Sequence, residues 1–154
     1  MNRLKIFLGS DHGGYEWKQK IFEYLAKNEY DAEDVGAKQL NPDDDYPQFA
    51  KQAALQVIGS QDDDPRAILI CRGGQGMAIA ANRHRGIRAS VIWNAHEAKM
   101  TRADNDSNVL CLPADHIPWE EVPGIIETWL STQFTQAQRH IRRLQEIDDF
   151  YPNS

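Results

Sequence analysis

The chain has 154 residues, 41% of them apolar and 26% charged, which is enough for one domain with a full hydrophobic core. A net charge of −6 and the lack of a basic stripe with interleaved aromatics argue against a nucleic-acid partner. The apolar runs are too short to cross a membrane, and the first residues, MNRLKIFLGSDHGG, contain no apolar signal core. Two cysteines allow at most one disulfide, so we expect a cytoplasmic protein.

Predicted strands and helices alternate along the chain. Short apolar runs bounded by glycine or polar turns predict strands at 4–8, 31–35, 67–70, 87–93 and 108–112. Helical spacing of apolar residues predicts helices at 15–27, 49–58, 77–83, 96–104, 118–134 and 136–150, the last highly charged. This alternation predicts an α/β fold in which residues 1–154 form one domain. We expect a doubly wound, Rossmann-like sheet of five parallel strands, with helices on both faces.

The stretch AILICRGGQGMAIAANR, residues 67–83, combines three signals. A buried strand ends at Cys71, a glycine-rich turn follows at 72–76, and good helix formers come next. Glycines let the backbone approach a ligand, and the free N–H groups at the start of a helix favour an anion. The pattern therefore predicts an anion site beside a thiol.

Two further polar loops are predicted to join Cys71 at the carboxyl edge of the sheet. Asp11 and His12 follow the first strand, and residues 102–108 lie between the fourth and fifth strands. The first and third strands are neighbours in this topology, so their loops should converge. A histidine, a thiol and backbone donors in one cleft are suited to proton transfer on a small anionic substrate.

Each signal also has a plainer explanation. A cysteine at a strand end is often a small buried hydrophobe, which suits Cys111 well. The RGGQG turn is neither GxGxxG nor a Walker loop, an Asp-His pair can cap a helix, and a basic run such as 139–143 is commonly a solvated helix face. The cysteine and histidine spacings argue against a metal site.

Six blocks of sequence resemble the type B ribose-5-phosphate isomerases and the related galactose-6-phosphate isomerase subunits. The blocks are GSDHGGYEWK at 9–18, DDYP at 44–47, ILICRGGQGMAIAANR at 68–83, GIRAS at 86–90, NDSNVL at 105–110 and RHIRRL at 139–144. Their order and spacing cover nearly the whole chain.

The resemblance implies an aldose–ketose isomerase that works through a cis-enediolate, without cofactor or metal. Cys71 would be the base, with a pKa depressed by the adjacent helix start, and Asp11 would contact sugar hydroxyls or shuttle protons. The family forms homodimers, in some cases tetramers, with sites shared between two chains. The implied substrate contacts are His12, Arg139 and Arg143 for the phosphate, Tyr46 and Asn105 for the sugar, and the turn residues Arg72, Gly73, Gly74, Gln75 and Gly76 around the enediolate oxygen.

Three departures from the family pattern leave the substrate open. The turn in the family is usually Gly-Thr-Gly-x-Gly, so Arg72 and Gly73 are unusual. Asp104 stands where the family has a ring-opening histidine. Asp115 or His116 occupies the region after the fifth strand where the family commonly has an arginine. Ribose 5-phosphate, with Asp104 or His96 opening the ring, is the first expectation. The alternatives are a tetrose, allose or galactose phosphate, a modified sugar whose carboxylate binds Arg72, or a non-catalytic sugar-phosphate binder. Retention of Cys71 argues against the binder.

Overall fold

Five strands form one parallel sheet in the computed structural model, which describes residues 4–150. The strand order is β2-β1-β3-β5-β4. The interior strands β3 and β5 are continuous apolar runs because both of their faces are covered. The predicted α/β sheet is confirmed. The strands are β1 Lys5–Ser10, β2 Asp31–Asp34, β3 Arg66–Cys71, β4 Ala89–Val91 and β5 Val109–Pro113.

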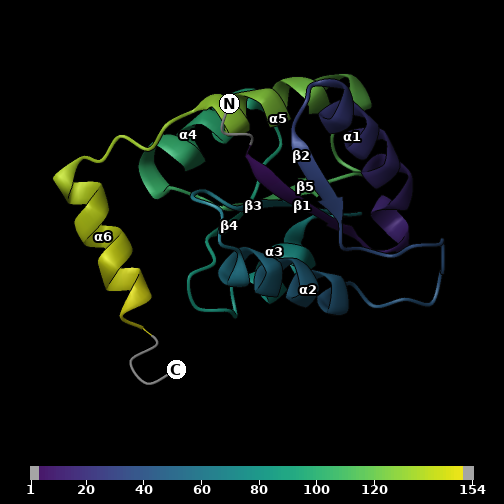
Figure 1. Ribbon diagram of the computed structural model, residues 1–154, viewed down its shortest axis with the longest axis horizontal. Helices are drawn as coiled ribbons and strands as arrows, with labels where there is room; N and C mark the ends of the chain where they lie inside the picture. The colour runs from purple at the N-terminus through teal and green to yellow at the C-terminus, as the bar shows by residue number, and fades with distance from the viewer. Residues whose placement is uncertain (1–3, 151–154) are drawn as a thin grey trace.

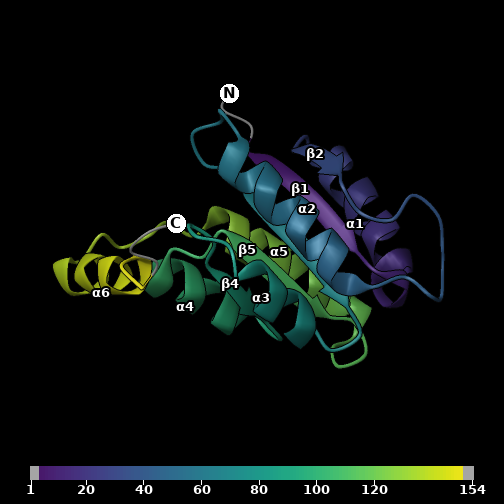
Figure 2. The same cartoon turned by 90° about the horizontal axis from the view of Figure 1, so that it is seen from below.

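Helices cover both faces of the sheet, as the two views in Figures 1 and 2 show. On one face lie α1 Tyr15–Lys27, α4 Ala95–Asn105 and α5 Val122–Ser131, and on the other lie α2 Tyr46–Gly59 and α3 Gln75–Ala81. Short 3₁₀ turns, η1 His12–Gly14 and η2 Trp119–Glu121, precede α1 and α5. None of the described helices is long and apolar enough to cross a membrane.

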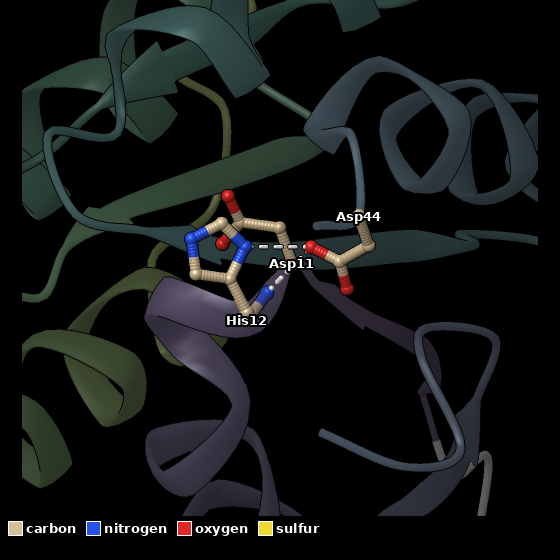
Figure 3. A group of neighbouring side chains, drawn as sticks. All are labelled: Asp11, His12 and Asp44. Carbon is tan, nitrogen blue, oxygen red and sulfur yellow. Dashed lines mark hydrogen bonds and ion pairs between the residues drawn. The ribbon is translucent and has the colours of Figure 1, made fainter. Parts of the chain in front are cut away.

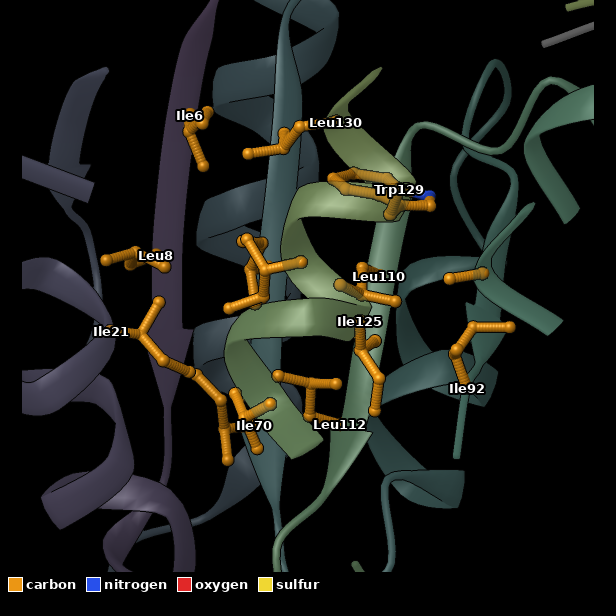
Figure 4. Close-up of a cluster of buried hydrophobic side chains, with 14 of the residues drawn as sticks. Ile6, Leu8, Ile21, Ile70, Ile92, Leu110, Leu112, Ile125, Trp129 and Leu130 are labelled. Carbon is orange, nitrogen blue, oxygen red and sulfur yellow. The ribbon is translucent and has the colours of Figure 1, made fainter. Parts of the chain in front are cut away.

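Two apolar cores follow from the alternation of side chains along each strand. Leu8, Ile70 and Leu110 point toward α1 and α5, where Ile21 and Trp129 pack against the sheet (Figure 4). The intervening residues of β3, including Cys71, belong to the core under α2 and α3. The alternation therefore directs the Cys71 thiol to the α2–α3 side of the sheet.

The charged carboxyl-terminal helix, α6 Gln138–Asp148, stands apart from the sheet (Figures 1 and 2). It packs against α4 through a buried face that includes His140 and Leu144, while Ile147 and Phe150 are exposed. It lies beyond the amino ends of the strands, far from the end of β3. The predicted helix is present, but it is shorter than residues 136–150.

Several element boundaries differ from the predictions for local reasons. The predicted helix at 118–134 is split into η2 and α5, since Pro123 fits the first turn of a new helix. It also ends earlier than predicted, because Thr132 already has an extended backbone. The second helix begins at Tyr46 rather than Phe49, since Pro47 fits its first turn. The fourth strand is reduced to Ala89–Val91 at the edge of the sheet.

Candidate active site

Cys71 ends β3 and lies against the glycine turn that starts α3. Its Sγ accepts a hydrogen bond from the N–H of Gly74 at 3.1 Å. Gly74 has φ of 71°, a left-handed conformation that suits glycine, and an added Cβ would lie 3.3 Å from the Pro113 nitrogen. The left-handed conformation of Gly74 therefore sets the shape of the turn, and the turn directs the Gly74 N–H at the thiol.

Burial raises the pKa of the Cys71 thiol, since its thiolate would lose solvation. Backbone N–H groups of Met77, Gly74 and Gly73 act in the opposite direction, and the charge of Asp11 raises the pKa further. The predicted depressed pKa is therefore wrong for the unliganded chain, because desolvation outweighs the donors at the helix start.

Asp11 and His12 follow β1 at the same edge as Cys71. The register pairs Ser10 with Ile70, so the residues that follow the two strands are adjacent, which confirms the predicted convergence. Asp11 Oδ1 accepts the N–H of Gly13 at 3.0 Å, so this residue also caps η1, the plainer role considered for it. Burial raises the pKa of the Asp11 carboxyl, against the opposing effect of His12 and the backbone donors.

Asp44 is a site residue that the sequence did not single out. Its Oδ1 lies 2.7 Å from His12 Nδ1 and accepts the backbone N–H of His12 at 3.0 Å (Figure 3). Asp11, His12 and Asp44 each bring one potential metal-ligand atom within 4.8 Å of the others. His12 and Asp44 are already joined by their short hydrogen bond, and the carboxyl group of Asp11 lies beside this pair.

Tyr46 and Arg72 lie beside the glycine turn. A Cβ on Gly76 would come 2.5 Å from the Tyr46 ring, so the ring rests directly on this glycine. The aliphatic part of Arg72 lies over Gly13 in the same way, and its Nη1 is 3.5 Å from Asp115 Oδ2. Arg72 is exposed, and so is the turn residue Gln75. The predicted contacts from residues 11–12, 46 and 71–76 thus share one edge of the sheet.

Asp104 and Asn105 lie at the other end of the sheet, so the predicted placement of residues 102–108 at the carboxyl edge is wrong. Asp104 and Asn105 end α4, which returns the chain to the amino end of β5. Val109 pairs with Ala67 and Pro113 with Cys71, so the two ends of this strand pair are roughly 13 Å apart.

A second group of predicted contacts gathers around α6. Asp104 Oδ1 is 3.4 Å from His140 Nε2, which connects α4 to α6. Arg139 and Arg143 are exposed on α6, beyond the amino end of the sheet. These two predicted phosphate ligands of one chain therefore do not face the Cys71 of that chain.

A thiol, two carboxylates and a histidine lie around the glycine turn, an arrangement suited to proton transfer. Sequence comparison identifies the class of the protein. The chain belongs to the ribose/galactose isomerase family, whose model matches residues 6–147. It is an aldose–ketose isomerase of that family.

Individual relatives match over nearly their full lengths. Ribose-5-phosphate isomerase B of Mycobacterium tuberculosis H37Rv is 32% identical over 152 residues, covering 97% of this chain and 91% of the relative. The structure of the Clostridium thermocellum ribose-5-phosphate isomerase B has a TM-score of 0.91 at 38% identity, covering 97% of this chain and 98% of that one. The Mycoplasma genitalium enzyme with bound ribulose 5-phosphate has a TM-score of 0.92 at 32% identity, covering 98% of both chains.

Proposed function

We propose that this protein interconverts ribose 5-phosphate and ribulose 5-phosphate. The relatives named above carry that activity in their names, and one of them was solved with ribulose 5-phosphate bound. The observation in this chain that carries the proposal is the Cys71 thiol at the end of β3, held by a Gly74 N–H and adjacent to Asp11. A group that accepts and returns a proton beside backbone donors is what an enediolate mechanism requires.

In the proposed reaction, Cys71 as thiolate removes the proton from C2 of the open-chain aldose. The electron pair of that bond forms the C1–C2 double bond of a cis-enediolate, and the charge moves to O1. Backbone N–H groups of residues 73–76 stabilise that oxygen. Asp11 transfers the hydroxyl proton from O2 to O1, and the thiol returns its proton to C1. The raised pKa of Asp11 suits a carboxyl group that must both accept and donate a proton.

We infer that the complete site contains residues of two copies of the chain. The Cys71 edge offers His12 and Arg72 to a phosphate, and Arg72 is paired with Asp115. Arg139 and Arg143, exposed on the projecting α6, would supply the missing charge when a second copy brings its helix to this edge. Asp104 and Asn105 would arrive with them. In that position the Asp104–His140 pair would provide a group for proton transfer during ring opening.

A partly apolar cavity between α6 and the sheet edge supports assembly of two copies. Its volume is about 330 Å³, and its lining includes the exposed Ile147 and Phe150 next to polar residues such as Arg88 and Asp148. Large apolar side chains exposed around one cavity are typical of an interaction site. Two buried free cysteines also suit a reducing cytoplasm, and one sheet with two continuous cores suits a single domain.

A substrate panel tests the proposal. Ribose 5-phosphate, allose 6-phosphate, galactose 6-phosphate and erythrose 4-phosphate are each incubated with the protein, and ketose formation is followed. We expect ribulose 5-phosphate to form fastest, and the Cys71→Ala variant to form it at least about 100-fold more slowly than the wild type. Conversion of another sugar phosphate but not of ribose 5-phosphate would show that the substrate is wrongly assigned. Conversion of none would overturn the proposed activity.

A further inference from the structure

The hydrogen bonds between His12 and Asp44 suggest a role for Asp44 that goes beyond the proposed reaction. Asp44 Oδ1 receives two contacts from one residue: the backbone N–H of His12 at 3.0 Å and the ring Nδ1 at 2.7 Å. The Nδ1 bond is as short as charge-assisted bonds usually are. In Figure 3 the second ring nitrogen, Nε2, is on the side of the ring away from Asp44.

The shared acceptor identifies which atom carries the proton. Both oxygens of an ionised carboxylate can only accept, so Oδ1, which accepts the backbone N–H, is the acceptor toward the ring as well. The proton of the 2.7 Å bond therefore belongs to Nδ1, and Nε2 is left for the substrate. Without a second proton Nε2 accepts a hydrogen bond from a hydroxyl, and with one it donates to a phosphate oxygen.

Holding its own loop in place does not explain why the Asp44 side chain is buried. Its side chain is only 8% exposed, and its Oδ2 has no hydrogen-bond partner among residues 4–150. The loop around Asp44 is held by other groups: Asn41 Oδ1 accepts the N–H of Asp43 at 3.0 Å, and Asn41 O accepts that of Asp44 at 3.2 Å. A buried carboxylate carries a desolvation cost, and here the bonds that offset it all go to His12.

We propose that Asp44 is a positioning residue, which fixes the orientation and tautomer of the His12 ring so that Nε2 faces the substrate phosphate. The proposal rests on the proposed role of His12 as a phosphate ligand. Asp44 itself does not touch the substrate. Its contribution is that the ring is already oriented before the substrate binds: Asp44 holds the Nδ1 proton, and Nε2 is directed at the phosphate, to which it donates when the ring carries its second proton.

The tautomer is measured directly by ¹⁵N NMR of the imidazole nitrogens of His12, in the full-length protein and without substrate. We expect the wild-type ring, in its neutral form, to carry its proton on Nδ1. Asp44→Ala should lose this preference, while Asp44→Asn, whose Oδ1 still accepts both N–H groups, should keep it. Asp43→Asn is the matched control, since Asp43 is an exposed neighbour in the same loop.

Kinetics provide the functional comparison. Loss of one hydrogen bond to a charged group should raise KM of Asp44→Ala at least about tenfold, with a smaller effect on kcat. Asp44→Asn should recover most of that loss, and Asp43→Asn should match the wild type. A wild-type ring protonated on Nε2, or an Asp44→Ala variant with unchanged tautomer and KM, would overturn the proposal. Equal losses in Asp44→Asn and Asp44→Ala would do so too.

The NMR result is independent of the substrate. Dissociation constants for inorganic phosphate, measured on the same variants, should follow the same order as KM. If the wild type fails to isomerise ribose 5-phosphate while these two measurements behave as expected, the proposed activity fails and the role of Asp44 stands.

Discussion

A single methyl group at Gly76 would test how the site positions Tyr46. A Cβ added at Gly76 would lie 2.5 Å from Tyr46 Cζ and 2.9 Å from its hydroxyl oxygen, closer than non-bonded atoms approach. Either α3 or the ring must move. The Tyr46 residue is 40% exposed, so we expect the ring of Gly76→Ala to turn into solvent and leave the sugar-binding edge.

Two opposing effects set the expected stability of Gly76→Ala. Alanine in a helix is more favourable than glycine by about 0.5–1 kcal/mol, which offsets part of the cost of displacing a half-exposed ring. The melting temperature should therefore stay within about 4 °C of the wild type. Loss of one sugar contact of about 1 kcal/mol should raise KM roughly fivefold.

The assays are thermal unfolding followed by circular dichroism and steady-state kinetics with ribose 5-phosphate. Gly124→Ala in α5 is the control, because its added Cβ would meet nothing within 4 Å. It should leave KM unchanged and stability equal or higher. A wild-type KM for Gly76→Ala would refute the assigned contact of Tyr46, and a large fall in melting temperature would show that the ring cannot move as proposed.

Three further outcomes follow from the buried polar groups. Cys71→Ala should lower kcat by about 10²–10⁴-fold, and a smaller loss in rapid-quench measurements would assign the base elsewhere. The raised pKa of Asp11 means that its ionisation disfavours the folded state, and this penalty grows as the pH rises above the ordinary carboxyl range. Asp11→Asn keeps the cap to Gly13, so it should melt higher than the wild type at pH 7 yet turn over slowly, and lower stability there would contradict the assigned pKa. Lys18 is fully buried and donates to Asp34 at 2.8 Å, and Asp34 is 22% exposed. Lys18→Met should therefore lower the free energy of urea unfolding by about 1–3 kcal/mol, and an unchanged free energy of unfolding would contradict this.

The sequence predicts the sheet well because its strands carry their own signals. The buried strand ending at Cys71 is a continuous apolar run, and Tyr15–Lys27 has a clear helical period and a polar turn before it. The first and third strands pair as expected, which brings Asp11 and His12 to Cys71. Boundaries near prolines and at the short edge strand depend on local packing, and these are the ones that differ.

The site is predicted less completely because three of its features depend on the fold. Residues 102–108 have the composition of a site loop, but a helix that returns the chain to the start of β5 carries them to the opposite edge. Asp44 is one of three consecutive aspartates, and only the folded loop distinguishes it by its two bonds to His12. The pKa of Cys71 depends on burial as well as on the helix start, and a sequence pattern reports only the second.

The claim that Cys71 of one copy works with Arg139 and Arg143 of another is tested most directly by mixing two variants, each without one of these side chains, at a substrate concentration where each variant alone is nearly inactive. Cys71→Ala and Arg143→Ala are each purified, dissociated together in mild denaturant and allowed to reassociate. In a mixed dimer one site would have both changes and the other neither, so random exchange of equal amounts should restore about a quarter of the wild-type activity. If both groups belonged to one chain, no intact site would form. A mixture that exchanges subunits yet stays as inactive as its components would contradict the shared site.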